Sequence, residues 1–226
     1  TSAAGCDSLA TLNLFVNPLI VPVFSTIGPL CLNSVAPILP LTSTNSITGT
    51  WSPATISTAV AGTTSYTFTP NAGQCASVAT IDIAVTNELT ASIISQSDVT
   101  CNGLSNGAIT VEVDLGSGTP PYIYSIDGGT IWQNNGTFTN LPAGVYAILI
   151  NDSVGCSATI NVSITEPVVL SSSTTTSNPT ICGGTGTITI SAIGGTPGYE
   201  YSMDGGATWN SFISPSDLLL PAGNYT

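Results

Sequence analysis

Few side chains in this sequence of 226 residues could carry out acid–base or nucleophilic chemistry. The chain has no Lys, Arg or His, and its 12 acidic residues give it a net charge of −12. Without an imidazole or an amine, it lacks the usual general bases and Schiff-base nucleophiles. It also has no cation to neutralise phosphates, which excludes nucleic acid as a partner. The sequence therefore predicts that this segment is not an enzyme.

Paired carboxylates remain as candidates, because two of them suffice for glycoside hydrolysis. Asp127 and Asp204 each precede Gly-Gly and are predicted to lie in turns, while Glu112 and Asp114 alternate on the solvent face of one strand. Both patterns are typical of ordinary solvated acids, so no catalytic residue is assigned. No cofactor is expected, although Ca²⁺ is left open because only oxygen ligands are present. The chain has no Asp-x-Asp-x-Asp loop.

Two further motifs favour structural roles. Residues 202–209 match the Asp-box, a hairpin found in sialidase propellers, and residues 125–132 nearly match it. A propeller would need a period near about 40–50 residues, so an isolated hairpin with a tryptophan packed beside it is the better interpretation. Five aromatic side chains could instead form a platform for sugars, but their recurrence fits a core or hairpin role: Trp51, Trp132, Trp209, Tyr122 and Tyr124.

The elements that must position these residues are repeated. Residues 120–132 return 77 positions later as 197–209, and residues 141–146 return as 220–225. A period near about 80 residues is too long for a solenoid unit and suits a small β-module. The sequence therefore indicates an array of modules.

Six cysteines mark the modules. Cys6, Cys75 and Cys156 each precede a short alternating strand, whereas Cys31, Cys101 and Cys182 stand near the starts of modules. No CxxC pair occurs, so zinc is not expected. Six buried free thiols are the alternative, but such regular placement favours disulfides and hence an oxidising, extracytoplasmic location.

The order of the cysteines predicts the module boundaries and the pairing. We expect the tail of a preceding module at 1–18, complete modules at 19–88 and 89–167, and a truncated one at 168–226. The predicted disulfides are Cys31–Cys75 and Cys101–Cys156, each joining an early loop to a late turn at one end of its module. Cys6 and Cys182 would then be unpaired within this segment of a longer repeat protein.

Alternation of apolar and polar residues predicts the fold. Ile109, Val111 and Val113 alternate with polar residues, and so do Ile160, Val162 and Ile164. No helical period persists for three turns, and 23 Gly with 15 Pro supply turns. We therefore predict an all-β fold of tandem Ig-like β-sandwich modules, arranged end to end by Pro-stiffened joints. Prolines break the most apolar stretch, residues 12–24, so no membrane insertion is expected.

The motifs of residues 89–167 resemble a known family. They include Cys101-Asn102-Gly103, residues 121–129, residues 141–146 and Asp152-Ser153-Val154-Gly155-Cys156. This segment resembles the SprB-type repeat of giant surface adhesins from gliding Bacteroidetes, and residues 168–226 resemble the same repeat without its end. Residues 49–53 and 66–75 are similar to Ig-like repeats of such proteins. The resemblance implies export by the type IX system and display on the bacterial cell surface.

Two functions follow as hypotheses. The first is a structural and adhesive stalk of a large cell-surface adhesin or filament, in which the partners are neighbouring modules and surface polysaccharide or other cell-surface proteins. The alternative is a set of carbohydrate-binding accessory modules of a secreted polysaccharide-acting enzyme. Ser8 and Ser153 each follow an aspartate and precede an aliphatic residue, a pattern similar to the O-glycosylation site of Bacteroidetes secreted proteins, although so short a motif also arises by chance.

Overall fold

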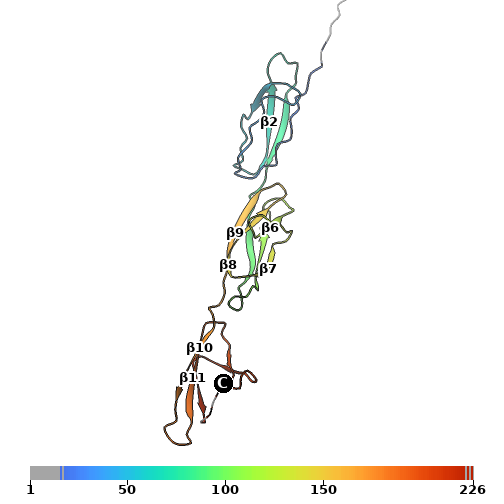
Figure 1. The fold of residues 1–226 in the computed structure, drawn as a ribbon. Coiled ribbons are helices and arrows are strands. Elements are labelled where there is room, and N and C mark those ends of the chain that lie inside the picture. Colours follow the sequence, from blue (N-terminus) through green and yellow to red (C-terminus); the bar gives the residue numbers. More distant parts are fainter. Residues whose placement is uncertain (1–15, 17, 222, 224, 226) are drawn as a thin grey trace, which may run out of the picture. The chain divides into compact units, whose positions relative to one another are not determined.

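The computed structural model describes residues 16, 18–221, 223 and 225, and every regular element in that part of the chain is a β-strand (Figure 1). The all-β prediction is therefore confirmed. The strands lie in small antiparallel sheets of two or three strands. The chain divides into two compact units, with the boundary between Glu88 and Leu89.

The first unit contains one sheet in the order β1-β2-β3, with β1 at Gly49–Ser52, β2 at Gly62–Pro70 and β3 at Ala79–Val85. Its core is aromatic: the rings of Phe24, Trp51 and Phe68 lie within 4.7–5.1 Å of one another. Phe68 and Ile83 are fully buried. Three tilted aromatic rings bury a large apolar area in a small domain, which compensates for a sheet of only three strands.

The segment before Cys31 runs alongside β3 in the same direction. Ile20 forms a parallel bridge with Ala76, just before β3 begins, and Leu30 forms one with Val85, where β3 ends. The bridges are made by backbone hydrogen bonds, among them those from Ser77 N to Ile20 O and from Leu30 N to Ala84 O, both of 2.9 Å. This path carries the chain from one end of the domain to the other before it reaches Cys31.

Residues 89–167 form a sandwich of two three-stranded sheets, β4-β5-β7 and β6-β8-β9. The strands are β4 Ala91–Ser97, β5 Gly107–Val113, β6 Ile123–Ser125, β7 Thr137–Leu141, β8 Gly144–Asn151 and β9 Ser157–Ile164. Ile109 and Val111 of one sheet and Val162 and Ile164 of the other are buried. Glu112, which follows Val111, and Ser163, between Val162 and Ile164, are exposed. The predicted alternation in these strands is confirmed.

The rest of the second unit repeats the first four of these strands and has one more, β13, where the preceding repeat has only the bridge between Tyr124 and Gln133. It has a sheet β10-β11-β14 and a hairpin β12-β13. Their bounds are β10 Ser171–Ser177, β11 Gly186–Ile193, β12 Tyr199–Tyr201, β13 Asn210–Phe212 and β14 Ser216–Leu220. The burial differs from that of the preceding repeat, because Ile188 and Ile190 of β11 are only half-buried where Ile109 and Val111 of β5 are buried.

Candidate functional site

The turn after β6 is organised by the carboxylate of Asp127. Its Oδ1 accepts hydrogen bonds from the Ser125 hydroxyl at 2.7 Å and from the N–H groups of Thr130 and Ile131, both at 3.0 Å. Gly128 and Gly129 have φ angles of 77° and 88°, so the turn needs residues without a Cβ at both positions. The amide of Ile131 and the Ser125 hydroxyl lower the pKa of Asp127, because they stabilise its charged form.

The same turn is built again after β12. Asp204 accepts hydrogen bonds from the Ser202 hydroxyl at 2.7 Å and from the N–H and hydroxyl of Thr208 at 2.8 and 2.6 Å. These bonds, led by that of the Thr208 hydroxyl, lower the pKa of Asp204 to about 2. Both carboxylates are therefore ionised hydrogen-bond acceptors near neutral pH. A catalytic acid needs the opposite shift, so the geometry assigns them a structural role.

A second cluster joins the first and last strands of the sandwich, and we call it the Asp98 clasp: Gln96, Asp98, Ser163 and Thr165. Asp98 accepts hydrogen bonds from the Thr165 N–H at 2.9 Å and its hydroxyl at 2.7 Å, and the Gln96 amide donates to Ser163 O at 2.8 Å. The Thr165 N–H makes the largest contribution to lowering the pKa of Asp98. A carboxylate and a hydroxyl thus take the place that an ion pair often occupies.

Asp152 has a structural role that the sequence analysis did not predict. It is buried, and Oδ1 accepts the N–H groups of Val154 and Cys156 at 3.0 and 2.8 Å while Oδ2 accepts that of Thr119 at 3.0 Å. Asp152 therefore fixes the turn that carries the late cysteine. The Asx-type spacing Asp-x-x-x-Cys was the signal available in the sequence.

Ser153 is exposed on the same turn, with its hydroxyl donating to Thr119 O at 3.1 Å. Its glycosylation stays a prediction. Ser8 and Cys6, which belong to the equivalent predicted turn, lie outside the described residues.

The predicted disulfides are not present. Cys31 and Cys156 are disulfide-bonded, but the partners predicted for them are free: Cys75, Cys101 and also Cys182 carry exposed free thiols. Cys31–Cys75 and Cys101–Cys156 are therefore wrong as pairings in this structure, although the prediction that Cys31 and Cys156 form disulfides is in keeping with it.

The physical reason is distance along a strand. Cys75 lies just before β3, bonded through its carbonyl to Ile20 N at 2.9 Å, while Cys31 follows Leu30 beside the far end of β3. A strand of seven residues spans about 23 Å, whereas disulfide-bonded Cα atoms lie within about 7 Å.

Cys101 and Cys156 are separated in the same way. Cys156 directly precedes β9, and the turn of Cys101 is bonded to the chain beyond the end of β9, through Asn102 to Pro167 O and Gly103 N to Glu166. The early and late cysteines of one module therefore lie at opposite ends, not at one end as predicted.

The aromatic residues do not form one platform. Trp51 is buried, with its Nε1 donating to Pro40 O at 2.8 Å, and Tyr124 is buried in the sandwich. Trp132 is half-buried and its Nε1 donates to Gly129 O at 2.9 Å, which confirms the prediction of a tryptophan beside this hairpin. Trp209 differs, because 60% of its surface is exposed.

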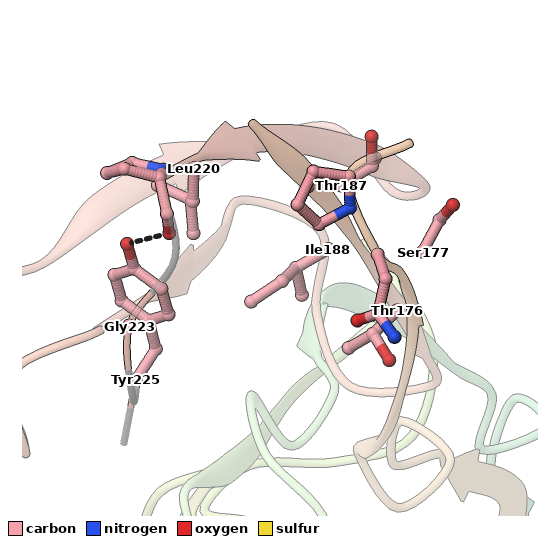
Figure 2. A pocket seen from close by; sticks show the side chains of 11 residues that line it. Thr176, Ser177, Thr187, Ile188, Leu220, Gly223 and Tyr225 are labelled. Atoms are coloured by element: carbon pink, nitrogen blue, oxygen red, sulfur yellow. Dashed lines mark hydrogen bonds between the residues drawn. The ribbon is translucent and has the colours of Figure 1, made fainter. Parts of the chain in front are cut away.

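Three concave sites among the described residues are open grooves lined by few ionisable groups. One, in the last repeat, has a volume of about 190 Å³ and is lined in part by Gly186. Figure 2 shows Ile188, Leu220 and Tyr225 around its opening. In the preceding repeat, the corresponding Gly107 packs closely against Ile164 of β9. A second groove contains Glu200, and a third, in the first unit, contains Asp82. None of these three grooves brings two carboxylates together.

Metal and membrane sites were sought in the same part of the chain. The described residues contain no group of three or more His, Cys, Asp or Glu side chains arranged to hold a metal ion. Among them there is also no helix long and apolar enough to span a membrane.

The fold and the repeated turns define an all-β repeat protein. Residues 93–131 and 174–208 each match the model of the SprB repeat. The chain therefore contains an SprB-type repeat region, as the motifs in its sequence predicted.

Other comparisons add little. None of the curated proteins compared with the chain matches it. Among solved structures, extracellular domains 3–5 of Drosophila OTK are similar over 74% of this chain, with 18% identity and a TM-score of 0.28. The matched region spans 63% of that structure. At that score the similarity carries no argument about fold or function.

Proposed function

We propose that this chain is part of the stalk of a large, repetitive adhesin on a bacterial cell surface. The observation that carries the proposal is the double occurrence of one SprB-type unit, with the same carboxylate-centred turn at Asp127 and Asp204. A chain whose only charged side chains are acidic, and whose described aspartates accept hydrogen bonds from hydroxyls and backbone amides, suits a passive extracellular spacer.

The proposal also names binding partners, an export route and a role in motility. Neighbouring modules of the same long chain would be its covalent partners, and surface polysaccharide or other cell-surface proteins its adhesive ones. Gliding motility and export by the type IX system belong to the same proposal, because they are what the resemblance to SprB-type adhesins implies. The modules would be those expected from the sequence, at 19–88, 89–167 and from 168 onward.

Small-angle X-ray scattering of the purified chain tests the stalk. A compact globule of this length has a radius of gyration of about 17 Å. Modules strung end to end should extend beyond about 100 Å, given strands that rise about 3.3 Å per residue, and a rod of that length has a radius of gyration of about 30 Å. A value near that of the globule would overturn the stalk.

Exposure of Trp209 favours a second candidate, in which the modules bind carbohydrate as accessories to a secreted enzyme. A flat, exposed indole ring beside a rigid turn is a surface on which sugar rings can stack. Retention of the chain on insoluble polysaccharides, lost in Trp209→Ala but kept in Trp132→Ala, would support this candidate. If neither variant changes retention, Trp209 is not a sugar platform.

A further inference from the structure

Three Asn-Gly pairs occur in residues 89–167, and the structure holds them differently. They are Asn102-Gly103, Asn106-Gly107 and Asn135-Gly136. In such a pair the backbone nitrogen of the glycine can attack the side-chain amide of the asparagine, because glycine has no Cβ to obstruct the approach. The surroundings of each pair therefore decide whether that reaction takes place.

Two of the pairs are held against the reaction. The carboxamide of Asn106 is bound at both ends by Thr100, whose N–H donates to Oδ1 at 3.1 Å and whose hydroxyl accepts from Nδ2 at 2.7 Å. Asn135 Oδ1 accepts a backbone N–H at 3.1 Å. Gly107 and Gly136 are buried, and a Cβ on them would meet neighbouring atoms at 2.8 and 2.0 Å. Neither glycine nitrogen has room to turn toward the side chain before it.

The pair Asn102-Gly103 is placed for the reaction. Both residues are exposed, and a Cβ on Gly103, which has a φ of 78°, would meet nothing within 4 Å. The N–H of Gly103 donates to Oε2 of Glu166 at 2.7 Å, and Nδ2 of Asn102 donates to Pro167 O at 3.1 Å. A carboxylate thus accepts the proton that the attacking nitrogen must lose, at the distance that a general base requires.

We propose that Asn102 is a self-modifying site, at which Gly103 N attacks Asn102 Cγ with Glu166 as the general base. The N–Cγ bond forms and the Cγ–Nδ2 bond breaks, while the proton taken by Glu166 passes to the departing nitrogen, which leaves as ammonia. Water then opens the cyclic imide at one of its two carbonyls, which gives aspartate or isoaspartate. A water molecule is consumed and ammonia is released, and no oxidant takes part.

The conversion alters the contact between this turn and the chain beyond β9. A carboxylate at residue 102 has no N–H to donate to Pro167 O, and it repels the nearby carboxylate of Glu166. It also adds a negative charge to a chain that already carries −12. The turn that holds Cys101 therefore separates more easily from residues 166–167 once the conversion has taken place.

Incubation of the purified full chain at neutral pH, followed by a brief digestion after glutamate, tests the site. The digestion releases residues 89–112, which carry both Asn102 and Asn106, while Asn135 lies in the next fragment. Tandem mass spectrometry locates the gain of about 1 Da that accompanies conversion of an amide to an acid. Asn102 should convert at least about tenfold faster than the other two, because those must first open locally. Equal rates at the three sites in the folded chain would overturn the proposal.

The variant Glu166→Gln tests the general base. It keeps an oxygen that can accept the Gly103 N–H but removes the basic carboxylate, so conversion of Asn102 should slow by at least about tenfold. Glu200→Gln, at an exposed carboxylate of the last repeat, is the matched control and should leave the rate unchanged. Circular dichroism shows whether both variants keep the melting temperature of the wild type. Conversion of Asn102 that is as fast or faster in Glu166→Gln would reject Glu166 as the base.

The same incubation in concentrated urea separates the fold from the local sequence. Without the contacts to Thr100 and Glu166, the three asparagines should convert at similar rates. If Asn102 kept its lead in urea, the difference would come from its neighbours in the sequence, and the assignment of the site to the folded structure would be wrong.

Discussion

Carboxylates in this chain find their partners among hydroxyls and backbone amides, because the sequence offers no cationic side chain. Asp127 and Asp204 each accept a serine hydroxyl and backbone N–H groups, and Asp98 accepts both donors of Thr165. Hydrogen bonds of this charged kind are stronger than neutral ones. Single aspartates therefore set the shape of whole turns.

The substitution Asp152→Ala tests most directly whether a single aspartate stabilises its turn. The change leaves the N–H groups of Thr119, Val154 and Cys156 without their acceptor; the bond to Cys156 is buried and the other two are partly buried. A buried donor without an acceptor costs about 1–3 kcal/mol, and a partly buried one costs less. We expect the free energy of unfolding of this module to fall by about 2–4 kcal/mol in urea titrations. Asp82→Ala, at an exposed carboxylate that accepts the Ser65 hydroxyl, is the control and should change little.

The lowered pKa values predict how stability depends on pH. Asp98, Asp114, Asp127 and Asp204 have pKa values below the usual 3.8, and that of Asp204 is about 2. Their stabilisation is present above the unfolded pKa and is lost as pH falls through the folded one. The melting temperature should stay level from pH 8 to about 5, where no histidine titrates, and drop between about pH 4 and 2.

Thermal unfolding followed by circular dichroism checks this profile. Asp204→Asn should make the drop shallower for the last repeat, because a group that no longer titrates contributes no pH dependence. A melting temperature that rises on acidification would contradict the prediction.

The strands were predictable because alternation reports directly on which face is buried, as Ile109, Val111, Val162 and Ile164 show. The sequence says less about which residues meet at each end of a module. Nothing in the sequence near Cys31 says that residues 20–30 run parallel to β3, and that direction decides which end of the module Cys31 occupies. The pairing failed for this reason, whereas the turns at Asp127 and Asp204 were found because Asp-Gly-Gly is a local signal.

The differences in burial between the two repeats could not be predicted from the local sequence either. Trp132 and Trp209 stand in matching motifs, yet Trp132 is half-buried and donates to Gly129 O while Trp209 is mostly exposed. The burial of each ring depends on what the neighbouring loops place over it, and those contacts are not encoded in the motif.

Strand β5 lies very close to Gly136, the residue before β7, and a substitution there tests how much this packing contributes to stability. A Cβ at Gly136 would lie 2.0 Å from Val111 O, whereas one at Gly144 meets nothing closer than 3.8 Å, and neither glycine has a positive φ. Gly136→Ala should therefore push the strands apart and lower the free energy of unfolding by about 1–3 kcal/mol. Gly144→Ala is the control, and equal losses in both variants would show that the contact does not matter.

The net negative charge predicts how salt changes the stability of the whole molecule. With a net charge of −12 and no cationic side chain, added salt has no ion pairs between side chains to weaken and only screens repulsion. Raising NaCl from 10 to 300 mM should leave the melting temperature unchanged or increase it, as measured by calorimetry. The increase should shrink at pH 3, where carboxylates begin to protonate, and a decrease at pH 7 would contradict the prediction.

The Asp98 clasp has a mechanical consequence. Its bonds link Gln96 to Ser163 and Asp98 to Thr165, and Val99 N donates to Thr165 O at 2.9 Å, so β4 and β9 run in the same direction where they meet. Tension applied where the chain enters β4 and leaves β9 pulls these two strands in opposite directions along their length. The bonds are then loaded in shear and must break together. A module of this kind should hold its length under load and then yield abruptly at a single force.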